Sequence, residues 1–512
     1  MTRTVFAPAC LAAVVLLATP ARSGTNNGSN PPSPAEDGTL PALAAVAGAG
    51  TMETHTYEFL EQLSDDIGAR VTGSPADAQA CEWSLRTMKS MGLENVHKEV
   101  YQIAHGWTRG TSDLELVAPI HRRLFSDSLG WVGSTPVGGL EAELVPVNRY
   151  TLEDELQYNR SKWRGKILII VARGPHIPHP GSEFAKFGPF LKEAQKAGAV
   201  AVIAGQAGTK SAGMRLTHTG ALGFDEYFDI PVVSIPAEDQ GQLERFLDRG
   251  LPVRLKLDVQ NHITTKPVDT ANIVGEIRGS EHPEQIIVVG GHLDSWDLAT
   301  GATDNGVGST AALGAAEAIL KSGFKPRRTI RFVLFTGEEQ GLLGSLAYTK
   351  LHKAEMANHV AAVILDSGQG PVVSLQLGGR KDLVPAVEKF AGALRAFGNL
   401  RVDDEVEFGT DTGPFILEGL PGINLDQDSP EYKFTHHSAA DTFDKVRADI
   451  LDRNATVVAL TAFWIADRPD RLATPWPAER TARMLVEKHE DVDLKIFNVW
   501  PFGNLGSDGD QH

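Results

Sequence analysis

A histidine and two carboxylates lie close together between an apolar run and a small-residue segment in the middle of the chain. The apolar run, residues 286–291, reads IIVVGG and is typical of a buried strand. His292 follows it directly, and Asp294 and Asp304 precede the segment that opens with Gly306. Open α/β sheets bind their ligands in loops at the carboxyl ends of parallel strands. The pattern therefore favours a metal site, with an ordinary polar loop between strand and helix as the alternative.

Two further predicted strands end in acidic residues. Glu338 and Glu339 follow the run TIRFVLFTG, and Asp366 follows VAAVIL. Taken singly, adjacent glutamates at a helix start can simply complement the helix dipole, and Asp366 could be an N-cap or turn residue. Because the carboxyl ends of parallel strands meet at one edge of a sheet, however, side chains from these loops can converge.

A histidine pair, His436 and His437, lies in a later loop shortly before Asp441. Alone, such a pair often belongs to the surface. Together with the earlier segments it gives two histidines and three carboxylates at the ends of one predicted sheet, plus one extra glutamate beside a ligand. Carboxylate oxygens and imidazole nitrogens suit Zn²⁺, and a shared carboxylate can bridge two ions about 3.5–4 Å apart. The joint pattern predicts a hydrolase that uses two metal ions.

The motifs around these residues resemble those of the M28 family of dizinc exopeptidases. They read GGHLDSWDLATGATDNG, FTGEEQGLLGS, LDSG, FGTDTGPFILEGLPGI and HHSAADT. The resemblance spans roughly residues 54–468 and includes IGARVTGSP near its start. The segments RGKILIIVAR and FLKEAQKAGAVAVI resemble a protease-associated (PA) domain. The resemblance implies a doubly wound, mostly parallel α/β sheet with a small β-rich PA domain inserted into it.

The resemblance also implies the roles of the metal ligands. One zinc ion would be bound by His292 and Asp366, and the other by Glu339 and His437. Asp304 would bridge the two ions. The cofactor expected is therefore two Zn²⁺ per chain.

Further residues would support the reaction. Glu338 would be the general base that takes the proton of a metal-activated water and passes it to the leaving amine. Asp294 would orient the imidazole of His292 from behind, and Asp441 would lie behind the ligands in the same way.

Two positions depart from the pattern of many family members. His436 stands where a tyrosine often precedes the second histidine ligand, and we expect it to donate a hydrogen bond to the developing oxyanion. The competing interpretation is a solvent-facing histidine. Asn305 follows Asp304 where many members carry a second aspartate, and a strained or cis peptide is expected at this bond.

Three other interpretations fit parts of the sequence. Asp366-Ser367-Gly368 and Asp411-Thr412-Gly413 match the aspartic-protease signature, but they lie among α/β elements and leave the His and Glu motifs without a role. Residues 306–311 (GVGSTA) weakly suggest a dinucleotide loop, yet they begin well after the strand. A PA-domain binding protein without zinc is the alternative from a different functional class, although all five ligand positions and the base are present.

Composition and the N-terminus limit the partners and the destination. The chain has 512 residues with 42% hydrophobic residues and a formal net charge of −17, which disfavours nucleic acid as a partner. Residues 1–23 have the form of a secretory signal peptide, with a membrane anchor as the less favoured alternative. After its removal only Cys81 would remain, so no intrachain disulfide is expected. The protein is expected to be exported and free of the membrane once the signal is cleaved.

The predicted organisation places the insertion inside one catalytic domain. The expected parts are a signal peptide (1–23), a flexible leader (24–50), the peptidase domain in two parts (51–123 and 263–470), the inserted PA domain (124–262) and a C-terminal tail (471–512) without an assigned function. By resemblance, the substrates are small unblocked peptides, in particular dipeptides, and the protein is a homodimer. An aminopeptidase that trims longer peptides is the alternative within the family. In a Gram-negative bacterium export would lead to the periplasm or outside, and in a eukaryote to secretion or a lysosome-like lumen.

Overall fold

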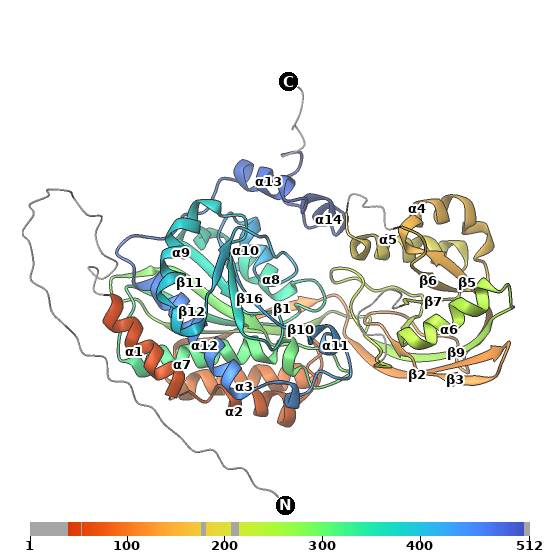
Figure 1. Ribbon diagram of the computed structural model, residues 1–512, viewed down its shortest axis with the longest axis horizontal. Helices are drawn as coiled ribbons and strands as arrows, with labels where there is room; N and C mark the ends of the chain where they lie inside the picture. Colours follow the sequence, from red (N-terminus) through yellow and green to blue (C-terminus); the bar gives the residue numbers. More distant parts are fainter. Residues whose placement is uncertain (1–38, 53, 176–180, 206–213, 506–512) are drawn as a thin grey trace, which may run out of the picture.

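A computed structural model describes residues 39–52, 54–175, 181–205 and 214–505. The expected signal peptide and most of the expected leader lie outside these residues. Within the described part, the chain forms a larger body and a smaller one, each with its own sheet of eight strands (Figure 1). No helix of the described part combines the length and the apolar character needed to cross a membrane.

The larger body is built on a mixed sheet with a parallel centre. Its strands, in spatial order, are β1 (Glu94–Ile103), β10 (Val268–Ile277), β12 (Arg328–Phe335), β11 (His282–His292), β13 (His359–Ile364), β16 (Gly422–Gln427), β14 (Val372–Gln376) and β15 (Arg401–Asp403). The four central strands, β12, β11, β13 and β16, run parallel to one another. Antiparallel pairings join β1, β10 and β14 to this centre. The predicted α/β class is therefore confirmed.

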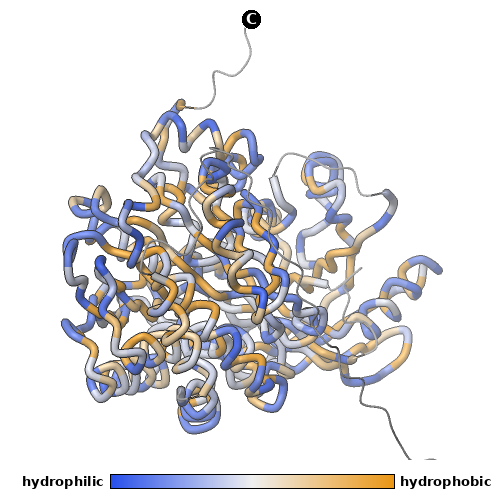
Figure 2. Tube along the Cα trace, turned by 60° about the vertical axis from the view of Figure 1, so that its left-hand side comes forward, coloured by the Kyte–Doolittle hydropathy of each residue, from blue (hydrophilic) through white to orange (hydrophobic). Residues whose placement is uncertain are grey.

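Helices cover both faces of this sheet, so successive residues of its central strands are buried on opposite sides. Ile287 and Val289 contribute to one core and Ile286 and Val288 to the other. The first face is covered by α1 (Thr39–Met52), α2 (Thr56–Glu61), α3 (Pro75–Met91), α7 (Val307–Ser322) and α12 (Ala448–Asp467), and α9 (Val384–Ala393) packs on the same core. The second face is covered by α8 (Leu343–Leu351) and α10 (Gly413–Leu417). Figure 2 shows hydrophobic segments gathered inside this body and hydrophilic segments towards its outside.

The smaller body is inserted between β1 and β10 of the larger sheet. Its strands, in spatial order, are β3 (Arg122–Leu124), β2 (Trp107–Ala118), β9 (Arg254–Ile263), β5 (Leu140–Asn148), β6 (Ile167–Val171), β7 (Ala201–Ile203), β8 (Val232–Ser234) and β4 (Asp127–Ser128). The helices α4 (Leu152–Asp154), α5 (Glu183–Ala197) and α6 (Ala237–Asp248) complete it. This second sheet begins earlier than the expected boundary at residue 124, because β2 pairs along its length with β9.

Both ends of the described chain contain helices, and the one near the N-terminus differs from the expected flexible leader. The last part of the expected leader forms α1, because Ala42, Val46 and Ala49 bury one face of that helix in the main core. The tail also contains two helices, α13 (Ala478–Glu487) and α14 (Asp491–Ile496). The leader prediction is thus wrong from residue 39 onwards, where alanine-rich sequence provides a small apolar helix face rather than a linker.

The strand that precedes the site approaches the following helix unusually closely. A Cβ atom placed on Gly291, near the end of β11, would lie 2.8 Å from the carbonyl carbon of Gly308 and 3.0 Å from the amide nitrogen of Ser309. Both neighbours are backbone atoms at the start of α7 and cannot move aside like a side chain. This contact fixes how far the loop between β11 and α7 can spread.

Gly291→Ala should therefore lower the free energy of unfolding by roughly 1–3 kcal/mol, the usual cost of overpacking. Gly48→Ala is a matched control, since Gly48 lies in α1 with no atom within 4 Å of the added Cβ. That substitution should stabilise the protein by roughly 0.4–1 kcal/mol. Denaturant midpoints measure both effects, and an unchanged midpoint for Gly291→Ala would contradict the close approach.

Candidate metal centre and active site

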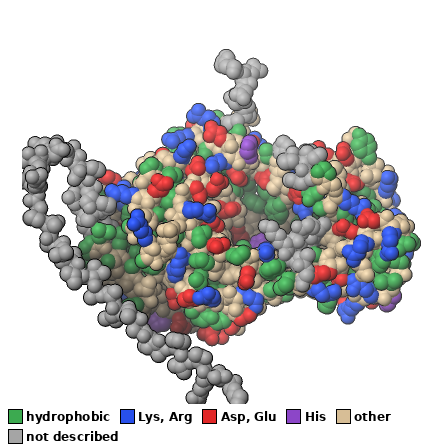
Figure 3. All heavy atoms as spheres, in the orientation of Figure 1, with side chains coloured by type: hydrophobic (Ala, Val, Ile, Leu, Met, Phe, Trp, Pro, Cys, Tyr) green, Lys and Arg blue, Asp and Glu red, His purple; other side chains and the backbone are tan. Residues whose placement is uncertain are grey.

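The predicted site residues converge at the carboxyl ends of the parallel strands. His292 ends β11, Glu338 and Glu339 follow β12, and Asp366 follows β13. Three further predicted residues, Asp304, His436 and His437, come from loops that reach the same edge, and with the exception of buried His292 all of these line one cavity of about 1250 Å³. Figure 3 shows the hollow between the two bodies, with acidic side chains along it.

A first group of possible metal ligands surrounds His292. Its Nε2 lies 3.2 Å from Oδ1 of Asp304 and 3.6 Å from Oδ1 of Asp366, and these three residues could hold an ion together. The other ring nitrogen, Nδ1, lies 2.9 Å from the backbone carbonyl of Asp294. Because a carbonyl oxygen only accepts, Nδ1 carries the proton, and Nε2 is left to bind a metal.

A second group forms around His437. Its Nε2 lies 2.9 Å from Oε2 of Glu339 and 3.4 Å from Oδ2 of Asp304. Its Nδ1 faces the backbone carbonyl of Thr219 at 3.2 Å, which again places the proton on Nδ1 and frees Nε2. Asp304 thus stands between the two histidines with one oxygen facing each, as expected for a bridging carboxylate.

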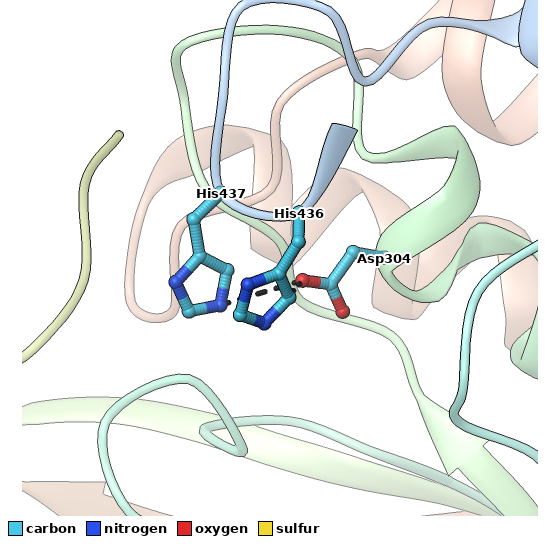
Figure 4. A group of neighbouring side chains, drawn as sticks. All are labelled: Asp304, His436 and His437. Carbon is cyan, nitrogen blue, oxygen red and sulfur yellow. Dashed lines mark ion pairs between the residues drawn. The ribbon is translucent and has the colours of Figure 1, made fainter. Parts of the chain in front are cut away.

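His436 lies beside this second group, although its side chain is partly exposed to solvent. Its ring stacks on that of His437 with centroids 3.7 Å apart, and its Nε2 is 3.8 Å from Oδ2 of Asp304 (Figure 4). Asp304, His436 and His437 also fall within the distances of a common ion. Its side chain is 47% exposed, yet surrounding protein and the adjacent imidazole lower its pKa to about 4. His436 is therefore neutral at physiological pH and can offer one N–H and one lone pair.

The donor set fits cations. Oδ2 of Asp304 and Oε1 of Glu339 are buried and have no hydrogen-bond partner among the described residues. Burial and then the neighbouring Asp304 carboxylate raise the pKa of Glu339 well above its usual range. Burial would lower the pKa of His292, but the carboxylates of Asp366 and Glu338 raise it well above its usual value. The site thus favours added positive charge, and nitrogen with carboxylate oxygen is the ligand chemistry of zinc.

Glu338, the predicted general base, lies in the cavity beside the first group. Its side chain is 12% exposed and lines the cavity, and its Oε2 lies 3.9 Å from Nε2 of His292. Burial, opposed by His292 and reinforced by Asp366, raises the pKa of Glu338 well above its usual range. A carboxylate with a raised pKa can hold a proton long enough to transfer it.

Asp294 supports the site differently from the prediction. Its carboxylate lies 3.6 Å from Nδ1 of His292, whereas its backbone carbonyl makes the hydrogen bond to that ring. The carboxylate instead accepts the backbone N–H groups of Glu338 and Glu339, both at 3.3 Å, and the hydroxyl of Thr72 at 2.9 Å. Asp294 therefore positions the base and a ligand of the next strand at the same time.

Asp441 holds the loop that carries the bridging residue. Its carboxylate accepts the backbone N–H of Thr303 at 2.5 Å and that of Asp304 at 3.2 Å. The following bond, Asp304–Asn305, is a cis peptide, as predicted. Asn305 donates to the carbonyl of Leu365, beside Asp366, so its amide ties the two ligand loops together.

Sequence reasoning missed three contributions. Arg70 is fully buried and donates to four backbone carbonyls, including those of Leu293 and Gly301, which frame the metal loop. Arg70 lies in the IGARVTGSP motif, and the resemblance of this motif to the family could have indicated its importance. Thr219 and His218 of the inserted body hydrogen-bond the His436–His437 loop. No sequence pattern indicates that contact, because these partners are more than two hundred residues apart.

Aromatic and acidic residues line the cavity in addition to the predicted metal ligands. Phe184, Phe187 and Phe224 of the inserted body line it together with Phe497 of the tail and Phe408. The acidic residues Glu407, Glu490 and Asp493 line it as well. Burial and then the charges of Glu407 and Asp493 raise the pKa of Glu490 to about 7.

Comparison with known proteins identifies the family of the chain. The family model of peptidase family M28 matches residues 272–462. Carboxypeptidase Q of Mus musculus is 33% identical over 436 residues, which cover 84% of this chain and 90% of that protein. The crystal structure of a peptidase M28 precursor from Shewanella amazonensis SB2B superposes with a TM-score of 0.77 at 29% identity, covering 86% of this chain and 99% of that one. A zinc aminopeptidase from Bacillus subtilis shares the fold, with a TM-score of 0.63 at 24% identity and coverage of 82% and 97%.

The raised pKa of Glu490 gives a pH-dependent prediction. Because its pKa is higher in the folded than in the unfolded chain, folding favours the protonated form, and stability is lost as pH rises from about 4.5 to about 7. Glu490→Gln should therefore raise the melting temperature, relative to the wild type, more at pH 8 than at pH 5. Glu487→Gln, at an exposed position of the same tail, is the control and should show equal shifts at both pH values. Equal shifts for Glu490→Gln would refute the assignment.

Proposed function

This chain belongs to peptidase family M28 and is a metallo-exopeptidase, and from that premise we propose that it is an exported dizinc enzyme which hydrolyses small unblocked peptides, in particular dipeptides. Export is supported by the signal-like residues 1–23. A homodimer remains part of the proposal through the family resemblance.

The position of Asp304 supports the binding of two zinc ions. One of its oxygens faces Nε2 of His292, and the other faces Nε2 of His437. His292 and Asp366 would hold one zinc ion, and Glu339 and His437 the other, with Asp304 shared. When bound, the two ions would polarise the peptide carbonyl and make a water molecule acidic enough to lose a proton near neutral pH.

The chain itself would move the proton. Glu338 lines the cavity beside the ligands and would take a proton from the attacking water onto its carboxylate. It would then give that proton to the amine that leaves. The hydrogen bonds from its own backbone N–H and that of Glu339 to Asp294 keep it in place during both steps.

His436 is proposed to donate a hydrogen bond to the oxygen that gains charge as the peptide bond is attacked. The neutral ring lies in the cavity beside Asp304, where one N–H is available for this purpose. The geometry also supports a second role, as an additional ligand, because His436 lies within ligand distance of Asp304 and His437.

A cleavage assay by mass spectrometry tests the function. The panel would hold unblocked dipeptides, their N-acetylated and C-amidated forms, and tetra- to hexapeptides, each with zinc and with chelator. Zinc-dependent cleavage confined to dipeptides with two free ends would support the proposal. Stepwise N-terminal trimming of longer peptides would make the protein an aminopeptidase instead, and no cleavage with zinc supplied would favour a binding protein.

Glu338→Gln should lower kcat by roughly 10²–10⁴-fold, the usual contribution of a general base, while both metal ions stay bound. His437→Ala is the matched comparison, and it should lose zinc together with activity because it removes a ligand. Metal content and kcat on the same preparations separate the two effects. A near-normal kcat for Glu338→Gln would disprove the mechanism.

His436→Ala should lower kcat at least tenfold, or about 1.4 kcal/mol of transition-state stabilisation, with the zinc content unchanged. Zinc titration against a competing chelator provides the second measurement. A loss of one bound ion would instead identify His436 as a ligand, and a fall of less than tenfold would leave it without a role in catalysis.

A further inference from the structure

The C-terminal segment, residues 478–505, forms part of the wall of the active-site cavity. Glu490, Asp493, Leu494 and Phe497 line the same cavity as Glu338 and the predicted metal ligands. Figure 1 shows α14 between the larger body and α5 of the inserted body. This segment, which had no function assigned from the sequence, therefore lies beside the proposed catalytic residues. Its contacts with the two bodies indicate its function.

On one side, the segment is fixed to the larger body. Leu485 and Leu494 pack with Ile416 of α10 in a small apolar cluster. Met484 occupies the space left by the missing side chain of Gly379, where a Cβ atom would lie 2.3 Å from its sulfur. The tail is therefore a packed part of the catalytic body rather than a loose end.

On the other side, the segment contacts the inserted body. The ring of Phe497 stacks on that of Phe224, with centroids 4.6 Å apart and planes inclined by 12°, and lies 5.6 Å from that of Phe184. The carboxylate of Asp493 accepts the backbone N–H of Ser182 at 2.7 Å. Phe497 is thus the aromatic side chain through which the tail touches the inserted body at the cavity.

Phe224 in turn packs on the turn that carries the base. A Cβ atom on Gly341, which has a φ of +110°, would lie 2.4 Å from Cγ of Phe224. The backbone N–H of Gly341 bonds to the carbonyl of Glu338 at 2.8 Å, and the N–H of Asp225 bonds to the carbonyl of Gln340 at 3.0 Å. Phe224 is therefore held between the base-carrying turn and Phe497.

We propose that Phe497 of the C-terminal segment holds Phe224 against the turn after Glu338 and so sets the substrate-binding wall of the cavity. This inference rests on the proposed peptidase function. Phe497 is a positioning residue, because it acts on the turn through Phe224. If the ring of Phe497 is removed, Phe224 loses its stacking partner. The cavity wall that contacts the peptide then becomes more mobile, while the proposed metal ligands and Glu338 keep their positions.

The test is the steady-state kinetics of Phe497→Ala on the best dipeptide of the panel. KM should rise at least tenfold, whereas kcat should change less than threefold and the zinc content should stay the same. Phe497→Tyr keeps the stacked ring and should restore KM to within threefold of the wild type. Trp500→Ala is the matched control, since Trp500 packs in the same tail without lining the cavity.

Hydrogen exchange gives a second measurement that does not need turnover. The amide of Asp225 should exchange at least tenfold faster in Phe497→Ala and at the wild-type rate in Trp500→Ala, because only the first variant frees the segment bonded to Gln340. This measurement separates the positioning role of Phe497 from the proposed peptidase function. If the wild type cleaves no peptide, the proposed function fails, and faster exchange would still support the positioning role of Phe497.

Two results would overturn the inference. One is an unchanged KM together with unchanged exchange at Asp225 in Phe497→Ala. The other is an equal loss of activity and melting temperature in Phe497→Ala and Trp500→Ala, which would show that the tail only stabilises the fold.

Discussion

The crowding of carboxylates around the buried imidazole of His292 and the partly buried imidazole of His437 is the constraint on which the rest of the structure depends. Contact with His292 and the neighbouring imidazoles holds the pKa of Asp304 below its usual range against burial, whereas burial and its neighbours raise those of Glu338 and Glu339. Like charges at such distances repel strongly in a poorly solvated site. Cations bound between them would turn this repulsion into attraction, and the fold holds the proposed ligands at distances that suit such cations.

Hydrogen bonds between buried charged side chains and backbone groups hold the loops that carry the proposed ligands. Arg70 joins four carbonyls around the metal loop, and Asp441 holds the amides of Thr303 and Asp304. Asp294 accepts the amides of the base and its neighbouring ligand. Most of the hydrogen bonds of these charged side chains go to backbone groups, so they fix the positions of whole loops. The proposed ligands lie at and after the carboxyl ends of the strands, and Arg70, Asp294 and Asp441 fix the distances between the loops that carry them.

The sequence predicted most of what lies within single motifs. His292, the Glu338–Glu339 pair and Asp366 each follow a recognisable apolar run, so their place at the sheet edge could be inferred from periodicity, and the α/β class followed from the same runs. The helix α1 and the tail packing could not be inferred, because an alanine-rich stretch and a mixed tail acquire their structure from a tertiary surface. Contacts such as Thr219 with His437 join residues far apart in the chain and leave no local pattern.

The contact between Thr219 and His437 implies that the inserted body belongs to the metal centre itself. His437 has a φ of +58°, a left-handed conformation that costs a residue with a side chain roughly 1–2 kcal/mol. Its carbonyl accepts the N–H of Thr219 at 2.9 Å, and its ring donates back to the carbonyl of the same residue. These two bonds hold the backbone and the ring in the orientation that directs Nε2 at Asp304 and Glu339. The larger sheet therefore positions His292 at the end of β11, whereas the orientation of His437, the second proposed histidine ligand, also depends on bonds from the insertion.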